Sequence, residues 1–206
     1  FSGDKSREGP TWAKILQPFR LMLPKNNHAC AKAAWFSDIN IAEINEALGT
    51  KIKGVILDVD ECMAEHHGEI IQKNIDHLRL MVSGVIRAMI FSNMKATDRY
   101  DPVKDLVDVH MSTYPKPDIR GFLECCKELG LPPEQVLMIG DNLVTDGGAI
   151  RSGINFALVN PMETPGQSIG TKIRRGPQTT FRAIARAISD FHDRILGRKV
   201  FRPIHQ

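Results

Sequence analysis

Acidic residues stand at two places in the sequence where apolar runs end. Asp58 and Asp60 close one such run, and Asp141 and Asp146 follow another. A carboxylate can attack an electrophile such as phosphorus, and a second carboxylate two residues away can act as general acid and base. An Asp-x-Asp pair is weak evidence by itself, because solvated turns carry the same pattern.

Other polar residues follow apolar runs in the same way. Ser92 and Asn93 come after such a run, and a hydroxyl with neighbouring backbone N–H groups suits anionic oxygens, although Ser-Asn is also ordinary in turns. Lys116 stands between Pro115 and Pro117, which restrict the backbone around it. Its ammonium could neutralise a phosphoryl group and a carboxylate. A Pro-rich loop entering the next helix explains the same residues equally well.

A metal site is implied if the fold brings the four aspartates together. Like charges at close range repel, so that Lys116 or a cation must compensate them. Asn142 follows Asp141 and adds a further polar group at that point. Carboxylate oxygens are hard ligands that suit Mg²⁺. The residue types therefore predict a divalent-metal site with Mg²⁺ as the cofactor.

Alternating strands and helices predict how these residues could meet. We expect an α/β, Rossmann-like fold with a parallel five-stranded sheet and helices on both faces. Polar chemistry in such sheets gathers outside the carboxyl ends of the strands, where the residues named above lie. The strands are expected within 54–58, 85–91, 104–111, 135–139 and 156–159. Helices are expected within 40–48, 70–81, 120–129 and 144–152.

The order and spacing of these residues resemble the four motifs of haloacid dehalogenase-like (HAD) phosphohydrolases. The resemblance covers about residues 50–160, and it is specific only when the four motifs are taken together. More narrowly, the sequence resembles subfamily IIIA, the YqeG-type branch that includes mitochondrial phosphatidylglycerophosphate phosphatases. The motifs are Ile56-Leu57-Asp58-Val59-Asp60, Ile90-Phe91-Ser92-Asn93, Lys116-Pro117 and Met138-Ile139-Gly140-Asp141-Asn142-Leu143-Val144-Thr145-Asp146.

The resemblance implies a role for each of the catalytic groups. Asp58 would attack phosphorus to form an aspartyl-phosphate, and Asp60 would protonate the leaving alcohol and then activate water. Ser92, with Asn93, would bind the phosphoryl oxygens. Lys116 would hold the charges of Asp58 and of the phosphate.

The resemblance also implies the metal ligands. Mg²⁺ would be held by the Asp58 carboxylate, the main-chain carbonyl of Asp60 and Asp141. Asp146 and Asn142 would orient the site from nearby. Two residues depart from the family pattern: Glu61 replaces the common Gly or Asn, and Cys62 stands where Thr is usual.

Short spacings between the motifs limit the substrate. The intervals from Asp60 to Ser92 and from Ser92 to Lys116 leave room only for scaffold elements, so that no cap domain is expected. An open site suits phosphate carried on a large molecule. The favoured function is a phosphomonoesterase for phosphatidylglycerophosphate or a similar lipid phosphate. A phosphatase for nucleic-acid ends or phosphoproteins, and a non-catalytic phosphoryl-binding scaffold, are the alternatives.

The chain divides into three expected parts: an extension over 1–50, a catalytic core over 51–160 and a basic helical segment over 161–206. Residues 151–206 carry 10 Lys and Arg against 3 Asp and Glu, whereas residues 1–150 carry 17 against 21. An apolar stripe at helical spacing is expected to pack on the core, with binding to a lipid interface as the alternative. Its members are Phe181, Ile184, Ala185, Ile188, Phe191 and Ile195.

The composition bounds the class of protein. The 206 residues, 42% of them hydrophobic, suffice for one ordinary core, and charges or prolines interrupt every apolar run before it reaches the length of a membrane span. Four cysteines are too few for a disulfide framework, so that a reducing compartment, the cytoplasm or an organelle matrix, is expected. Apolar and basic residues near both ends predict peripheral contact with an anionic membrane, and nucleic acid is less favoured. The oligomeric state is left open.

Overall fold

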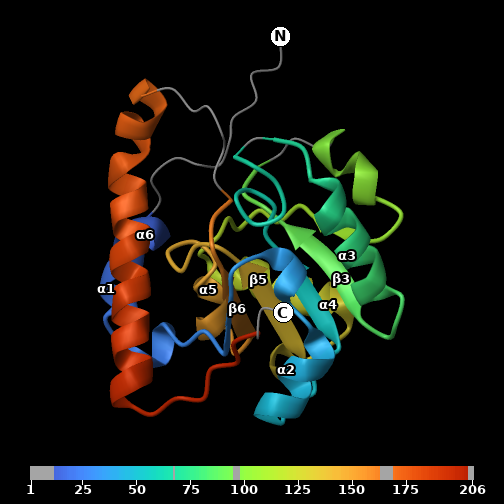
Figure 1. The fold of residues 1–206 in the computed structure, drawn as a ribbon, viewed down its shortest axis with the longest axis horizontal. Coiled ribbons are helices and arrows are strands. Elements are labelled where there is room, and N and C mark those ends of the chain that lie inside the picture. Colours follow the sequence, from blue (N-terminus) through green and yellow to red (C-terminus); the bar gives the residue numbers. More distant parts are fainter. Residues whose placement is uncertain (1–11, 67, 95–97, 163–168, 204–206) are drawn as a thin grey trace.

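A six-stranded parallel sheet forms the centre of the molecule (Figure 1). The computed structural model describes residues 12–66, 68–94, 98–162 and 169–203, without the side chains of 12–15, 18 and 169–178. The strands lie in the order β1-β6-β5-β2-β3-β4, and every neighbouring pair is parallel. They are β1 (Ala31–Ala33), β2 (Gly54–Leu57), β3 (Arg87–Phe91), β4 (Asp108–His110), β5 (Val136–Gly140) and β6 (Asn155–Val159).

The predicted α/β parallel sheet is confirmed, but the predicted number of five strands is wrong. The additional strand, β1, pairs with β6 at the sheet edge, with Ala31 opposite Ala157. Its three residues are Ala, Lys and Ala, which carry neither the β-branched side chains nor the period-two pattern that marks a strand. Tertiary pairing alone makes this segment a strand. The expected N-terminal extension thus contributes to the sheet, and the three-part division of the chain stays a prediction.

Helices connect the strands on both faces of the sheet. They are α1 (Trp12–Leu21), α2 (Ile41–Leu48), α3 (Gln72–Val82), α4 (Ile119–Leu129), α5 (Gly148–Arg151) and α6 (Ile169–Ile195). Short 3₁₀ turns are η1 (Pro24–Asn26), η2 (Phe36–Asp38), η3 (Asp98–Val103) and η4 (Pro133–Gln135). Gly49 and Gly130 adopt the left-handed conformation that ends α2 and α4, and these glycines directly follow the helices expected over 40–48 and 120–129.

One predicted helix is much shorter in the structure. The helix expected over 144–152 is reduced to α5, because the residues before it turn around the side chain of Asp146. A side chain that hydrogen-bonds nearby backbone groups competes with helix formation. The shortening therefore reflects the geometry of the loop that follows β5.

Alternate residues of the central strands feed two hydrophobic cores. Val55 and Leu57 of β2 belong to the core beneath α2 and α3, whereas Ile56 belongs to the core beneath α4 and α5. This division follows from the two-residue period of a strand, and burial on both faces explains why β2 is uniformly apolar. The sheet is thus packed on both faces, and loops follow the carboxyl ends of its strands.

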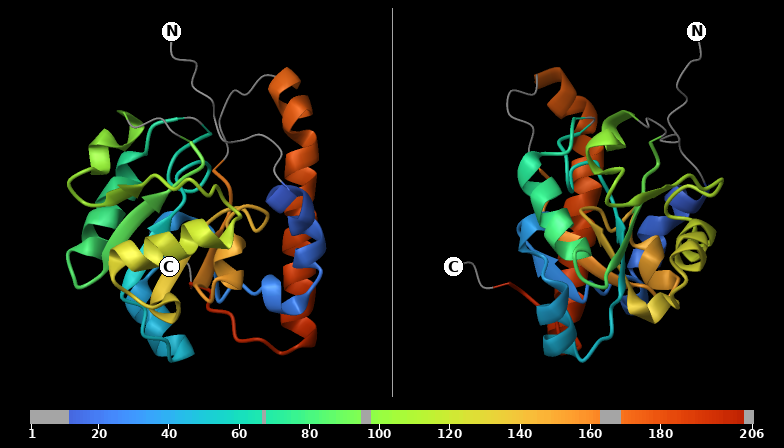
Figure 2. Two further views of the ribbon diagram at one scale, coloured as in Figure 1. Left: turned by 180° about the vertical axis from the view of Figure 1, so that it is seen from behind. Right: turned by 90° about the vertical axis from the view of Figure 1, so that its right-hand side faces the viewer.

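Helix α6 lies beside α1 along one side of the molecule, as the three views agree (Figures 1 and 2). The predicted packing of its apolar stripe on the core is wrong for most of the stripe. Ala185 is buried, but Phe181, Ile184, Phe191 and Ile195 are 50–63% exposed. Polar residues of the opposite face pack on the domain instead.

A buried polar network accounts for this inverted docking of α6. Lys32 of β1 donates hydrogen bonds to Asp193 at 2.6 Å, Asp190 at 2.7 Å and Ser189 at 3.2 Å. Ser189 in turn donates to the carbonyl of Asn27. Buried polar groups require such partners, so that the polar face of α6 is drawn inward. Among the described residues, no helix combines the length and apolarity that crossing a bilayer requires.

Candidate active site

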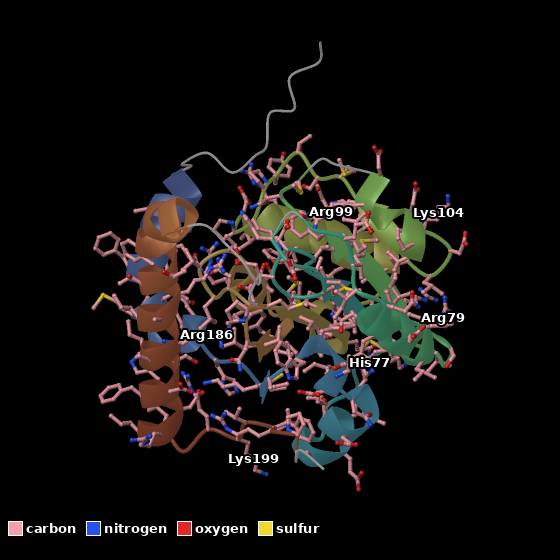
Figure 3. The ribbon with its side chains drawn as sticks, turned by 45° about the horizontal axis from the view of Figure 1, so that its top comes forward. His77, Arg79, Arg99, Lys104, Arg186 and Lys199 are labelled. Atoms are coloured by element: carbon pink, nitrogen blue, oxygen red, sulfur yellow. The ribbon has the colours of Figure 1, made fainter. Side chains whose placement is uncertain are left out.

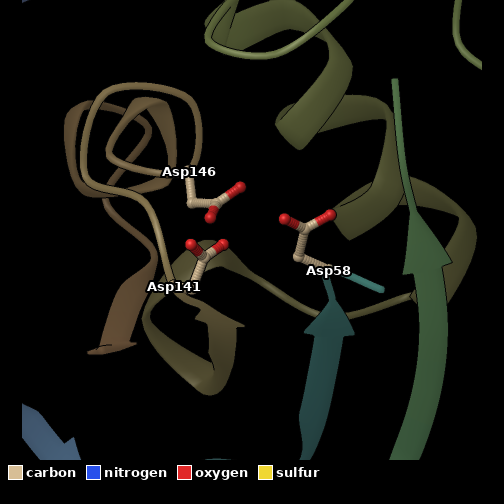
Figure 4. Close-up of side chains that lie close together, drawn as sticks. All are labelled: Asp58, Asp141 and Asp146. Carbon is tan, nitrogen blue, oxygen red and sulfur yellow. The ribbon is translucent and has the colours of Figure 1, made fainter. Parts of the chain in front are cut away.

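The polar residues predicted to meet do follow the carboxyl ends of adjacent strands. Asp58 follows β2, Ser92 follows β3, and Asp141 follows β5. Because β2 lies between β3 and β5 in the sheet, their loops converge. Figure 4 shows Asp58, Asp141 and Asp146 with their carboxylates turned toward one another.

A buried lysine joins two of these carboxylates. The Nζ of Lys116 lies 2.7 Å from Asp58 Oδ1 and 2.7 Å from Asp146 Oδ1. All three side chains are almost completely buried. Removal of charges from water is costly, so that ion pairing between these groups is strong and fixes their geometry. One ammonium cannot, however, neutralise two carboxylates.

Asn93 positions this lysine through its main chain. Its Oδ1 accepts a hydrogen bond of 2.8 Å from Lys116 N, and its Nδ2 donates one of 3.2 Å to Lys116 O. The neighbouring Ser92 is half-buried, and its hydroxyl accepts a hydrogen bond from Met94 N. The predicted contacts of Ser92 and Asn93 with substrate stay predictions. The side-chain amide of Asn93 holds Lys116 in this structure.

The loop after β5 is built around Asp146. Asn142 N donates to Asp146 Oδ2 at 3.2 Å, and Asp146 N donates to Asn142 O at 2.7 Å. A Cβ atom at position 140 would lie 2.3 Å from Asp146 Oδ2, so that only glycine fits there. The Gly-Asp motif thus allows the Asp146 carboxylate to lie directly over the end of β5.

Burial and charge set the pKa values of the site. Burial raises the pKa of Asp58 to about 7, while Lys116 opposes the shift. Burial likewise raises the pKa of Asp141 well above its ordinary value, against the effect of Arg182. For Lys116, burial alone would lower the pKa, but Asp146 and Asp58 raise it. The site therefore contains a fixed ammonium and carboxyl groups that lack sufficient positive charge.

Asp60 points to a different partner. Its Oδ1 accepts a hydrogen bond of 2.8 Å from Arg99 Nη1, and Arg99 Nη2 donates to Gly68 O at 2.8 Å. Arg99 lies in η3 (Figure 3). Sequence reasoning missed this arginine because it stands in a polar stretch without a motif of its own.

Two arginines of α6 also reach the site. Arg182 forms ion pairs with Glu61 and with Asp141, whose Oδ2 is 3.0 Å from Nη1. Arg186 projects from α6 toward the domain (Figure 3) and donates to the carbonyl of Asp141 at 2.7 Å. Both stand within the segment of the predicted apolar stripe, and their four-residue spacing is the signal in the sequence that they share a face.

The donor set fits a divalent cation. Ligand oxygens of Asp58, Asp141 and Asp146 all lie within 4.8 Å of one another, and the buried Oδ2 of Asp141 has an ion pair with Arg182 but no hydrogen bond within the described part of the chain. Five carboxylates, those of the three aspartates with Asp60 and Glu61, face four basic side chains, those of Lys116, Arg99, Arg182 and Arg186, which leaves one negative charge. Clustered oxygen ligands and this charge suit an ion such as Mg²⁺. The individual ligand assignments stay predictions.

Comparison with protein families is consistent with this chemistry. Residues 69–153 match the family model described as haloacid dehalogenase-like hydrolase. This match supports the interpretation of the chain as a haloacid dehalogenase-like hydrolase. The matched segment includes Ser92, Lys116, Asp141 and Asp146. The prediction of an enzyme is thereby confirmed at the level of a hydrolase.

Solved structures offer more distant similarities to this hydrolase. A predicted HAD-like family hydrolase from Porphyromonas gingivalis has 14% identity and a TM-score of 0.46, over 61% of this chain and 99% of the other. A hypothetical protein from Xanthomonas campestris has 18% identity and a TM-score of 0.46, over 78% and 94%. The cobalt-bound deoxy-D-mannose-octulosonate 8-phosphate phosphatase from Haemophilus influenzae has 16% identity and a TM-score of 0.45, over 72% and 91%. Among curated proteins, none matches the sequence significantly.

The remaining reactive residues of the hydrolase are cysteines and histidines. Cys62 is buried beneath the site, where burial raises the pKa of its thiol well above the ordinary value. All four cysteines are free and buried. His66 lies half-buried in the loop after β2, and His67 lies outside the described residues.

Proposed function

We propose that this hydrolase is a Mg²⁺-dependent phosphomonoesterase that acts through an aspartyl-phosphate at Asp58. The observation that carries the proposal is the buried cluster in which Lys116 holds Asp58 and Asp146 at 2.7 Å each, with Asp141 beside them. Such a cluster suits a carboxylate nucleophile and the charge of a phosphoryl group.

The chain's own residues account for both half-reactions. A carboxylate oxygen of Asp58 bonds to phosphorus as the ester P–O bond breaks, and Asp60 gives its proton to the departing alcohol. Asp60 then takes a proton from water, whose oxygen attacks phosphorus and releases Asp58 and inorganic phosphate. Lys116 holds the charge of the nucleophile and the phosphoryl oxygens throughout. Arg99 pairs with Asp60 in this structure, so that this mechanism requires the ion pair to open when substrate binds.

Mg²⁺ held by Asp58, Asp141 and the main-chain carbonyl of Asp60 would neutralise the phosphoryl oxygens. Asp146 and Asn142 would keep the loop of Asp141 in place, as their mutual hydrogen bonds support.

We further propose subfamily IIIA, its YqeG-type branch, and phosphatidylglycerophosphate or a similar lipid phosphate as the substrate. The short motif spacing supports an open site without a cap domain. The exposed apolar face of α6 supports a substrate that resides in a membrane. We define this face as Phe181, Ile184, Phe191 and Ile195.

Residues beside the apolar face of α6 extend it and supply positive charge. Phe19 and Met22, at the end of the adjacent α1, are 70% and 63% exposed. Arg20 of α1 is half-buried and Lys25 of η1 is exposed, and both carry positive charge. Apolar side chains with basic neighbours suit an anionic bilayer surface. Trp12 and Ile15 are further apolar residues of α1, and their side chains lie outside the described set.

Phosphate release from a panel of esters tests the proposed function. The panel contains phosphatidylglycerophosphate in anionic vesicles, a 5′-phosphorylated oligonucleotide, a phosphopeptide and an aryl phosphate, each with Mg²⁺ or with EDTA. We expect Mg²⁺-dependent release, fastest from the lipid. The variant Asp58→Asn should lose activity by about 10⁴-fold or more, because an amide is a poor nucleophile, while its circular dichroism is unchanged.

A control variant and three contrary results complete this test. Asp105→Asn, an exposed aspartate between β3 and β4, should retain full activity. Preference for the oligonucleotide or phosphopeptide would replace the lipid substrate, and failure to release phosphate from any ester would indicate a phosphoryl-binding scaffold. Near-normal turnover by Asp58→Asn would exclude the aspartyl-phosphate.

A further inference from the structure

Helix α6 delivers two guanidinium groups, one helical turn apart, to a single residue of the site. Arg182 lies 3.0 Å from the carboxylate of Asp141, and Arg186 donates a 2.7 Å hydrogen bond to its main-chain carbonyl. Arg186 also bonds the carbonyl of Val159, at the end of β6, and donates to Asn160 Oδ1 at 3.1 Å. Asp141 is thus held at both its side chain and its backbone by one helix.

Asp141 has few other means of orientation. Its side chain is almost fully buried, and its Oδ2 makes no hydrogen bond with a described residue, so that within the described part of the chain the ion pair with Arg182 restrains this oxygen. A carboxylate that must present an oxygen to a cation depends on partners that fix its rotation. Arg182 is placed to do this.

Glu61 provides the second anchor of Arg182. Its backbone adopts a left-handed conformation with φ of 60°, which is strained for a residue other than glycine or asparagine. Its carboxylate is buried and pairs with Arg182, and its carbonyl accepts a hydrogen bond of 2.7 Å from Met162 N. A strained backbone conformation persists where surrounding interactions hold it, and here the ion pair of Glu61 with Arg182 of α6 is such an interaction.

We propose that Arg182 and Arg186 are positioning residues for Asp141, so that the C-terminal helix is an integral part of the active site. Arg182 ties the loop after β2, through Glu61, to the loop after β5, through Asp141. Arg186 fixes the backbone of the second loop against β6. The inference rests on the proposed function for the identity of Asp141 as a metal ligand, whereas the positioning itself is a property of the metal-free protein.

Two measurements on the full chain test this inference. The variants are Arg182→Gln, Arg186→Gln and the charge-conserving Arg182→Lys. Arg194→Gln is the matched control, because Arg194 is exposed on the same helix, about 12 Å along its axis from Arg186. The first measurement is hydrogen exchange of the amides of 141–147 without metal, and the second is the affinity for Mn²⁺ by calorimetry.

Loss of either positioning arginine should release Asp141. We expect faster exchange over 141–147 and an affinity for Mn²⁺ that falls about 10- to 100-fold in both Gln variants, with no change in Arg194→Gln. Arg182→Lys should recover part of the affinity, since it restores the charge without the planar geometry. The turnover of the Gln variants should recover at high Mn²⁺, which a disrupted fold would not allow.

Contrary outcomes separate the inference from the proposed function. If both Gln variants have the hydrogen exchange and the Mn²⁺ affinity of the wild type, the inference is wrong, and the arginines only hold α6 against the domain. Tighter Mn²⁺ binding by Arg182→Gln would make Arg182 a competitor of the metal, which also overturns the inference. If the wild-type protein neither binds Mn²⁺ nor releases phosphate, the proposed function fails, and the exchange of 141–147 still decides whether the arginines position this loop. Should Arg182→Gln fail to fold, Arg186→Gln and Arg182→Lys give the same comparison.

Discussion

Asp60 and Arg99 show how a single ion pair can control the proposed proton transfer. Arg99 is nearly buried, and its Nη1 lies 2.8 Å from Asp60 Oδ1. A general acid must carry a proton and reach the leaving oxygen, whereas an ion pair holds the carboxylate charged and in place. Substrate that displaces Arg99 would therefore release Asp60 for catalysis.

The variant Asp60→Asn should separate substrates by their leaving groups. Loss of the acid should slow alkyl phosphates by about 10²- to 10⁴-fold and affect aryl phosphates much less, because an aryl oxide leaves without protonation. Turnover rates on glycerol phosphate and on an aryl phosphate measure the difference. Equal losses on both esters would contradict the role of Asp60 as the acid.

Protonation of Asp58 links stability to pH in the metal-free hydrolase. Its pKa is raised by burial from 3.8 to about 7, so that between these values the folded chain holds a proton that the unfolded chain releases. The free energy of unfolding therefore falls as pH rises through this window. Urea denaturation in the presence of EDTA, measured from pH 4.5 to 7.5, should show this fall in the wild type. The variant Asp58→Asn should lack that contribution.

Added Mg²⁺ should counter the loss of stability that accompanies rising pH. A cation binds the deprotonated carboxylates, so that its effect on the melting temperature should grow from pH 5 to pH 7.5. If the free energy of unfolding of the wild type rises with pH relative to that of Asp58→Asn, the raised pKa is contradicted.

The elements of this fold derive their positions from polar as well as apolar contacts. Helix α6 docks through Lys32, Ser189 and Asp193, although its sequence offers a continuous apolar stripe. Burial of a charged network is costly unless every partner is present, and here Lys32 has three acceptors. Strand β1 and helix α6 are therefore coupled, and the loss of one partner should weaken both.

Substitution of the buried lysine tests this coupling. Lys32→Met leaves the buried carboxylate of Asp193 with His28 and Arg198, and should lower the free energy of unfolding by about 3 kcal/mol. Urea denaturation measures the change. Lys25→Met, at an exposed lysine of η1, is the control and should change stability by less than about 0.5 kcal/mol. A similarly small effect of Lys32→Met would show that apolar contacts suffice to hold α6.

At the scale of the whole molecule, two functions are assigned to opposite faces of one helix. The inner face of α6 carries Arg182 and Arg186 into the site, and its outer face is apolar and exposed. If the outer face lies on a membrane, the site is held at a fixed distance from the lipid surface. This arrangement agrees with a substrate whose phosphate projects from a bilayer.

Sedimentation with vesicles tests the outer face. We expect binding to anionic vesicles at low salt that weakens at high salt, because salt screens the basic residues but leaves apolar insertion intact. Phe191→Ser should reduce the binding about 10-fold, as loss of one inserted aromatic side chain predicts. Leu80→Ser, at a 73% exposed leucine of α3 on the other side of the molecule, should bind as wild type. Equal binding of both variants, or none by wild type at low salt, would contradict membrane contact through α6.

The sequence by itself determined the alternation of strands β2 to β6 with helices and the convergence of Asp58, Ser92, Lys116 and Asp141. Apolar runs with polar residues at their ends define parallel strands, and the carboxyl ends of such strands meet by topology. It could not show β1, whose three residues form a strand only because β6 offers an open edge. Nor could it show Arg99, Arg182 and Arg186, which reach the site across long sequence separations.

Only the tertiary structure decided which face of α6 turns inward. The apolar stripe predicts one orientation from local periodicity, whereas the buried carboxylates of Glu61 and Asp141 and the buried ammonium of Lys32 demand partners from the opposite face. An unpaired buried charge costs more than an exposed apolar side chain, so that the polar face is the one that packs. The position of Arg182 beside Asp141 is the result of that physical preference.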